Sequence, residues 1–196
     1  MKYVKILGLL AVAAAALMAF AGIASATTVT SPTGTVILDT TAIHAVNTGG
    51  AHVKLSNPIA NIECQSTVEG EISKQGAGVT AEGGISVLDF TSCTNSWHVT
   101  TVSPGTLIAH WTGTGGVYNG TVTSNGAKVR TTRLGVVCVY VTSATPIGTL
   151  TGGTPATLAI SASIPINEAE SSALCGKGNA AWSGGYTTTS SLYLDK

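Results

Sequence analysis

Charged side chains are scarce in this sequence. Only 9% of its residues are Asp, Glu, Lys or Arg, against about 25% in ordinary globular proteins. Positive and negative charges balance over the whole chain, and basic residues form no cluster. Nucleic acids and anionic membrane surfaces are recognised through clustered Lys and Arg, so the sequence predicts neither as a partner. Hydroxyl and amide side chains are left to keep the surface soluble.

The residue patterns of common hydrolases are also missing. No Gly-x-Ser-x-Gly motif occurs, and Asp39, Asp89 and Asp195 are the only aspartates that could orient a catalytic histidine. Glu69 and Glu71 lie two residues apart on one expected strand. That spacing is too short for an acid and a nucleophile on either side of a glycosidic bond. The sequence therefore predicts no enzymatic activity.

Metal-binding patterns are lacking as well. No two cysteines form a Cys-x-x-Cys knuckle. His98 and His110 would face each other across a hairpin if the turn at Ser103-Pro104-Gly105 has a three-residue loop, but no third ligand is evident. We therefore predict no metal and no other cofactor.

An export signal is present at the start of the chain. Two lysines and a long apolar stretch lead to Ala24-Ser25-Ala26, the small-x-small pattern that signal peptidase cleaves. We predict a secretory signal peptide over residues 1–26 and a single secreted, extracellular domain over residues 27–196. An uncleaved membrane anchor is the alternative. After cleavage, loss of the two lysines leaves a net charge of 0 − 2 = −2 and no stable membrane insertion.

The secreted part contains all four cysteines, Cys64, Cys93, Cys138 and Cys175. An even number in an exported chain indicates two disulfides. Spacing alone does not separate the three connectivities. We favour Cys64 with Cys93 and Cys138 with Cys175, because each pair brackets a local run of strands and turns.

The strand pattern predicts an all-β fold. Leu134–Val141 is an unbroken apolar run, typical of a strand covered on both faces. Residues 159–166 alternate between apolar and small or polar side chains, which is typical of a one-sided strand, and Pro165 places its end at an edge or bulge. About ten short strands separated by turns favour a single antiparallel β-sandwich, immunoglobulin-like or jelly-roll-like, with Val136–Val141 at its centre.

Turn residues mark the expected connections. Ser103-Pro104-Gly105 predicts a hairpin, and Gly83-Gly84 predicts another turn. Asn119-Gly120 and Asn125-Gly126 are both hairpin signals, although they lie too close together for both to be tight turns. Asn167, with Glu three residues later, predicts the start of a helix of at most two turns.

Three parts of the C-terminal half are informative: Val137-Cys138-Val139-Tyr140, the run from Ile147 to Gly153, and Cys175 followed by Trp182, Gly185-Tyr186 and Leu192-Tyr193. On these residues the sequence resembles a group of small exported β-proteins of high-GC Gram-positive bacteria. The resemblance implies export and two disulfides. No activity is established for that group, so no functional residue carries over.

One candidate ligand surface follows from aromatic residues. Trp97-His98 and His110-Trp111 are arranged symmetrically about the expected Pro104-Gly105 turn. Aromatic faces stack on sugar rings, and nearby polar groups bind the sugar hydroxyls. These four residues are a possible ligand surface. More broadly, a sugar-stacking surface could be built from the tryptophans and tyrosines, although only 5% of the chain is aromatic and at least half of these residues must form the core. The tryptophans and tyrosines concerned are Trp97, Trp111, Trp182, Tyr118, Tyr140, Tyr186 and Tyr193.

Two functions remain after these exclusions. We expect a secreted, non-catalytic structural or surface-associated protein, and the alternative is an extracellular binding module for a glycan, a protein or a cell-surface component. Open sheet edges with few lysines would allow self-association. A monomer results instead if residues 27–32 and 167–176 cover those edges.

Overall fold

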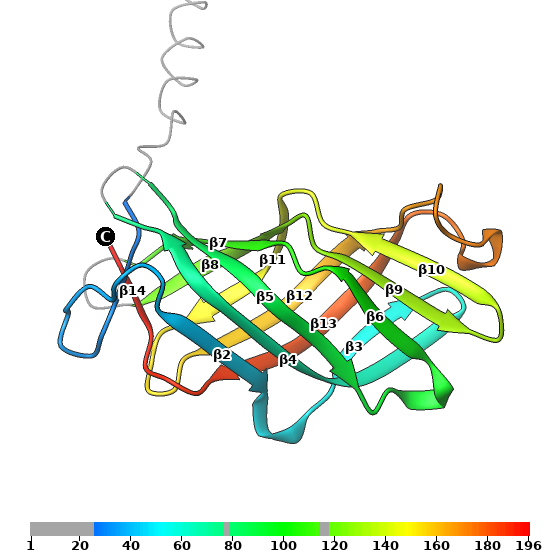
Figure 1. The fold of residues 1–196 in the computed structure, drawn as a ribbon, viewed down its shortest axis with the longest axis horizontal. Helices are drawn as coiled ribbons and strands as arrows, with labels where there is room; N and C mark the ends of the chain where they lie inside the picture. The colour runs from blue at the N-terminus through cyan, green and yellow to red at the C-terminus, as the bar shows by residue number, and fades with distance from the viewer. Residues whose placement is uncertain (1–25, 77–78, 114–117) are drawn as a thin grey trace, which may run out of the picture.

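The computed structural model describes residues 26–76, 79–113 and 118–196, so the predicted signal peptide lies outside it apart from Ala26. The regular secondary structure of these residues is β-strand apart from three short 3₁₀ turns (Figure 1). The strands are β1 (Thr28–Thr30), β2 (Ala42–Asn47), β3 (Val53–Asn57), β4 (Ala60–Lys74), β5 (Ala81–Thr91), β6 (His98–Ser103), β7 (Thr106–Trp111), β8 (Asn119–Asn125), β9 (Lys128–Arg133), β10 (Val136–Val141), β11 (Thr145–Thr151), β12 (Thr157–Pro165), β13 (Asn179–Thr188) and β14 (Tyr193–Asp195).

The largest sheet closes on itself. Its hydrogen-bonded order is β12-β11-β8-β7-β5-β4-β2-β13, and β13 pairs in turn with β12. β2 and β3 occupy one position in this ring, because each pairs with β4 on one side and with β13 on the other. The result is a closed barrel of eight strand positions.

A three-stranded sheet, β10-β9-β6, continues one part of the barrel wall. β6 runs into β7, β8 into β9, and β10 into β11, each through a link of two or three residues. The pairing of β7 with β8 ends at Thr106 and Asn125, and the pairing of β6 with β9 resumes at Ser103 and Lys128. Each of these strand positions is therefore one long strand with a bend in the middle.

The all-β prediction is confirmed, and the sandwich is corrected. An immunoglobulin-like or jelly-roll sandwich has two separate sheets with open edges, whereas β12–β13 pairing joins the ends of the large sheet here. The strands also follow one another around the wall as an up-and-down meander. Val136–Val141 is one segment of that wall. β12 pairs with β11 only over residues 157–160, and its end at Pro165 pairs with β13 alone, so the expected edge position of that end is confirmed.

Two expected hairpins are instead a bend in a strand and the start of a strand. β6 and β7 do not pair with each other, so Pro104-Gly105 bends a single strand. Gly105 has φ +74°, and a side chain there would lie 2.4 Å from the backbone nitrogen of Ala127. Asn119-Gly120 begins β8, where an added Cβ on Gly120 would lie 2.5 Å from the backbone carbonyl oxygen of His110. Close approach of backbones, and not a turn, requires both glycines.

The apolar run around Cys138 is divided by a hairpin turn. Leu134 and Gly135 both have positive φ and connect β9 to β10, and the Leu134 side chain is 93% exposed. The strand proper begins at Val136. Its central residues Cys138, Val139 and Tyr140 are at most 3% exposed, so the expected cover on both faces is confirmed for this part.

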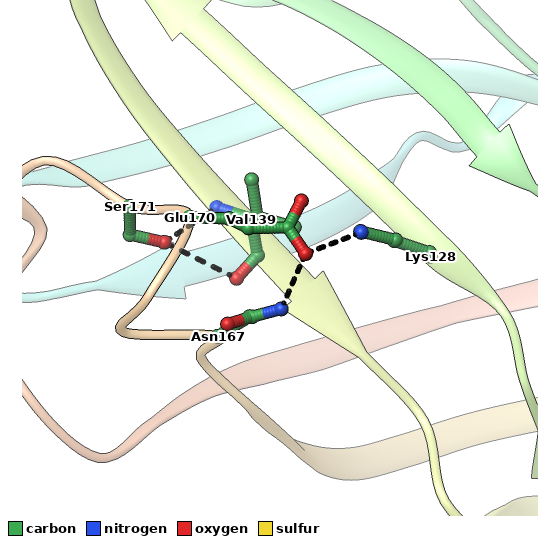
Figure 2. A network of polar contacts seen from close by, with 5 residues as sticks. All are labelled: Lys128, Val139, Asn167, Glu170 and Ser171. Atoms are coloured by element: carbon green, nitrogen blue, oxygen red, sulfur yellow. Dashed lines mark hydrogen bonds and ion pairs between the residues drawn. The ribbon is translucent and has the colours of Figure 1, made fainter.

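A strap of residues 167–175 runs along β10. The backbone nitrogen of Asn167 donates to Val139 O at 2.8 Å. The nitrogen of Val139 donates to Ser171 Oγ at 2.9 Å (Figure 2). The helix expected to start at Asn167 is wrong: only a short 3₁₀ turn, Ala173–Cys175, forms. Asn167 uses its side chain differently, since Nδ2 donates to Glu170 Oε1 at 2.8 Å.

Glu170 also ties the strap to the wall. Lys128 Nζ on β9 donates to Glu170 Oε1 at 2.5 Å (Figure 2). This hydrogen bond is the main reason that the pKa of the Glu170 carboxyl lies below its usual value. The strap thus covers the edge of β10 with backbone, hydroxyl and carboxylate groups, which is one of the ways in which proteins protect sheet edges.

Both disulfides join the expected partners. Cys64 on β4 bonds to Cys93, and Cys138 on β10 bonds to Cys175 at the end of the strap. All four cysteines lie in the described part of the chain, and none of them is free. The favoured connectivity is therefore confirmed.

The apolar core has two clusters inside the barrel. The larger includes Ile62, Cys138 and Ile164 in the half that β6, β9 and β10 complete. The smaller includes Val29 and Leu194, which belong to a two-stranded sheet of β1 and β14. This small sheet covers the opposite end of the barrel (Figure 1).

Candidate ligand-binding cavity

A cavity of about 170 Å³ lies inside the barrel beside the small core cluster. For comparison, an engineered cavity of about 150 Å³ in another protein stays dry and binds benzene. Residues from β2, β4, β5, β7, β8, β11, β12 and β13 form its wall, and β1 and the segment leading into β14 close one end. The lining residues are Val29, Ile43, Ala45, Val68, Gly70, Glu71, Ile72, Ala81, Glu82, Gly83, Gly84, Ile85, Leu88, Leu107, Ala109, Val122, Ser124, Ile147, Leu150, Leu158, Ile160, Trp182, Tyr186, Thr188, Leu192 and Leu194.

Alanine and glycine residues at inward positions on one side of the barrel, among larger apolar residues such as Ile72 and Leu107, leave room for the cavity. Ala45, Gly70, Ala81, Gly83 and Ala109 all line it from four neighbouring strands, β2, β4, β5 and β7. The facing strands β8, β11, β12 and β13 contribute mostly large apolar side chains. An eight-stranded barrel has an interior just wide enough to be filled by side chains or to hold one small ligand. Small residues at these inward positions leave that space open.

Sequence reasoning missed this cavity. Gly83-Gly84 was expected to be a turn, but both residues lie inside β5 and pair with β4. Residues 81 and 83 are both small and two positions apart, which is the spacing of one strand face. Such a pattern becomes informative only once the strand and the direction of its inward face are known.

Hydroxyl groups near the cavity are mostly paired. The Tyr186 hydroxyl donates to Ser66 Oγ at 2.9 Å, and both residues are buried. Burial raises the pKa of Tyr186 to about 12, while its hydrogen bond with Ser66 acts in the opposite direction. Ser124 Oγ lies 3.0 Å from Thr142 Oγ1, in a pair that is also buried. The wall therefore offers a ligand chiefly apolar surface.

The charged residues in the described part of the cavity lining are all acidic. Among residues 26–76, 79–113 and 118–196, no Lys, Arg or His lines the cavity, whereas Glu71 and Glu82 border it. Glu71 is exposed and Glu82 is half-buried, so both carboxylates lie toward the outside of the wall. A ligand with an anionic group would be desolvated here without a cationic partner, at considerable cost.

A second, smaller cavity of about 60 Å³ lies further along the interior. Phe90, Val99 and Tyr140 are among its lining residues, together with Cys64 of the first disulfide. The Asn57 amide donates a hydrogen bond to the Tyr140 hydroxyl, and burial raises the pKa of Tyr140. Leu88 and Trp182 line both cavities.

The sequence-predicted surface residues are not brought together. His98 on β6 and His110 on β7 are exposed, and they lie on one bent strand, opposite Thr132 and Thr121. They are twelve positions apart along the chain, a span of up to about 40 Å.

The two tryptophans also lie apart. Trp97 is only 6% exposed and belongs to the large core cluster, with the Arg133 guanidinium 6.0 Å from its ring. Trp111 is half-buried at the far end of β7, against the small core cluster. Its backbone nitrogen donates to Thr27 Oγ1 at 3.0 Å.

Within the described ranges, no group of three or more His, Cys, Asp or Glu residues is placed to hold a metal ion. The same residues include no helix long and apolar enough to cross a membrane. Comparison with protein-family models, curated proteins and solved structures gives no match. Fold and cavity together define the class of the protein: an eight-stranded antiparallel barrel with two disulfides and an apolar internal cavity.

Proposed function

We propose that this protein is a secreted, non-catalytic binding protein that holds one small, uncharged, apolar molecule inside its barrel. The observation that carries the proposal is the cavity of about 170 Å³ with its apolar wall. Export is part of the proposal: two disulfides favour an oxidising compartment, and the N-terminal sequence has the pattern of a signal peptide.

The energetic cost of the empty space supports a binding role. At about 24 cal/mol per Å³, a cavity of 170 Å³ destabilises a protein by about 4 kcal/mol. The net stability of a domain is commonly only about 5 to 15 kcal/mol. An apolar ligand that fills the space would recover much of this loss. Small residues on four adjacent strands maintain the cavity, and larger ones at the same inward positions would remove it.

The chemistry of the wall selects the ligand. Size restricts it to a molecule in the range of benzene or a short alkyl chain. Because the described lining has no cationic side chain, a carboxylate group is disfavoured. Neutral hydrocarbons, and alcohols whose hydroxyl group can reach the cavity rim, meet both requirements.

The sequence-based expectations concern other modes of action. A structural or surface-coat role, and binding to a glycan or a protein at the outer surface, make no use of an internal cavity. Aromatic side chains that would form a sugar-stacking face lie partly in the core, with Trp97, Tyr140 and Tyr186 at most 6% exposed. We therefore place ligand recognition in the interior.

Calorimetric titration of the secreted protein with 1-hexanol, hexanoate and soluble cell-wall glycans tests the proposal. We expect 1-hexanol to bind with a Kd on the order of 1 mM, hexanoate to bind at least about tenfold more weakly at pH 7, and glycans to give no heat. Glycan binding without alcohol binding would refute the proposal in favour of an outer-surface module. Absence of any binding would favour the structural role.

A further inference from the structure

We propose that Trp182, together with Leu88, sets the length of the apolar molecule that the barrel accepts. This inference rests on the proposed function and deepens it, because it assigns a specificity-determining residue. The two side chains form a partition between the two cavities. A ligand chain that fills the first cavity ends against this partition.

The position of the two residues supports this role. Each lines both cavities, Leu88 from β5 and Trp182 from β13. β4 and the position shared by β2 and β3 separate these strands in the wall, so the side chains approach from well-separated sides of the barrel. Trp182 lies on the same, inward face of β13 as the buried residues Ala180 and Tyr186. Its indole is the largest side chain common to both linings.

The cavity volumes give the expected lengths. A space of 170 Å³ is slightly larger than one that holds benzene, so it should hold a chain of about seven carbons. The second cavity adds 60 Å³, roughly a third of the first, which corresponds to about two or three more carbons. A ligand reaches that space only if the partition is removed.

A homologous series of n-alkanols from butanol to dodecanol tests the proposal by calorimetry. For the natural sequence, affinity should rise about fourfold per methylene and stop rising near about seven carbons. For Trp182→Ala, the rise should continue to about ten carbons or beyond, and for the milder Trp182→Phe the break should shift in the same direction. Trp182→Ala combined with Val99→Phe, which fills the second cavity, should move the break back toward the natural length.

Leu150→Ala is the matched control, because Leu150 lines the first cavity and not the second. Leu150→Ala should strengthen the binding of branched or bulky alcohols, but the affinity for n-alkanols should still stop rising near the natural chain length. The proposal is overturned if the Trp182 variants keep the natural break, or if the natural protein shows no break up to dodecanol. Failure of every alkanol to bind the natural protein would reject the proposed function as well, so the two failures are distinguishable.

Discussion

Filling the cavity from β2 should stabilise the protein and abolish binding at the same time. Ala45 lines the cavity, is 9% exposed and lies opposite Val68 and Thr188, which also line it. Ala45→Leu places three additional carbons in the empty space. Burial of about 0.8 kcal/mol per carbon sets an upper limit of about 2.4 kcal/mol.

Imperfect packing of the new side chain will remove part of this gain. We expect a net stabilisation of about 1 to 2 kcal/mol, which raises Tm by about 2 to 8 °C for a domain of this size. The same variant should lose most of its affinity for 1-hexanol. Ala42→Leu is the matched control, since Ala42 lies on the same strand, is exposed and does not line the cavity.

The stability change is measured by thermal and urea unfolding of both variants and the natural protein. The change in affinity is measured by titrating 1-hexanol into the same three proteins. A destabilised Ala45→Leu that binds 1-hexanol normally would refute the reasoning, because it would mean that no usable space exists beside Ala45. Loss of binding in Ala42→Leu would equally contradict an interior site.

Three further predictions concern the rest of the fold. Gly148→Ala should destabilise the protein by more than about 2 kcal/mol, because the added Cβ would lie 1.9 Å from a carbonyl oxygen of β12. Gly84→Ala, where no atom lies within 4 Å of an added Cβ, should change the free energy of unfolding by no more than about 0.5 kcal/mol. Urea unfolding measures both, and equal effects would contradict the strand register. Replacing Cys138 and Cys175 by Ser opens a loop of 37 residues and should lower the free energy of unfolding by about 4 kcal/mol, and an unchanged denaturation midpoint would count against this. The pKa of Tyr186 in the folded protein is about 12 against a usual 10, so its contribution to stability is complete below pH 10 and is lost as pH rises through about 12. A pH titration of tyrosinate absorbance should show a late component that Tyr186→Phe removes. Persistence of that component in the variant would disprove the assignment.

Local patterns in the sequence indicated many of the strands. The buried centre of β10 and the alternation of β12 follow from apolar periodicity, which depends only on neighbours in the chain. Both disulfides follow from the same local logic, since each closes a short run of strands. These features needed no knowledge of distant contacts.

Closure of the barrel could not be predicted in this way. Sandwich and barrel strands have the same alternation, and the difference lies in whether β12 pairs with β13 and β13 with β2. Pro104-Gly105 shows the same limit, because the pair fits a hairpin turn as well as a bend in one strand. Only the pairing of β6 with β9 and of β7 with β8 distinguishes them.

Predicting the cavity would require both the local strand pattern and the long-range pairing of the strands. Ala45, Gly83 and Ala109 are ordinary strand residues in the sequence, and nothing local marks them as inward-facing. Their positions converge only after the sheet closes and places β2, β5 and β7 on the same side of the interior. The exposed aromatic surface was inferred from local symmetry about a turn, and the long strand that replaces this turn separates its members.

Diffraction from crystals of the secreted protein pressurised with xenon is the most direct test of the central claim. Xenon enters dry apolar cavities of this size and needs no knowledge of the natural ligand. We predict a xenon atom inside the barrel, in contact with Ala45, Val122 and Ile160, and its absence from the same place in Ala45→Leu. An interior without xenon, or one filled by ordered water molecules or side chains, would contradict the claim that the barrel is built to hold a small apolar molecule.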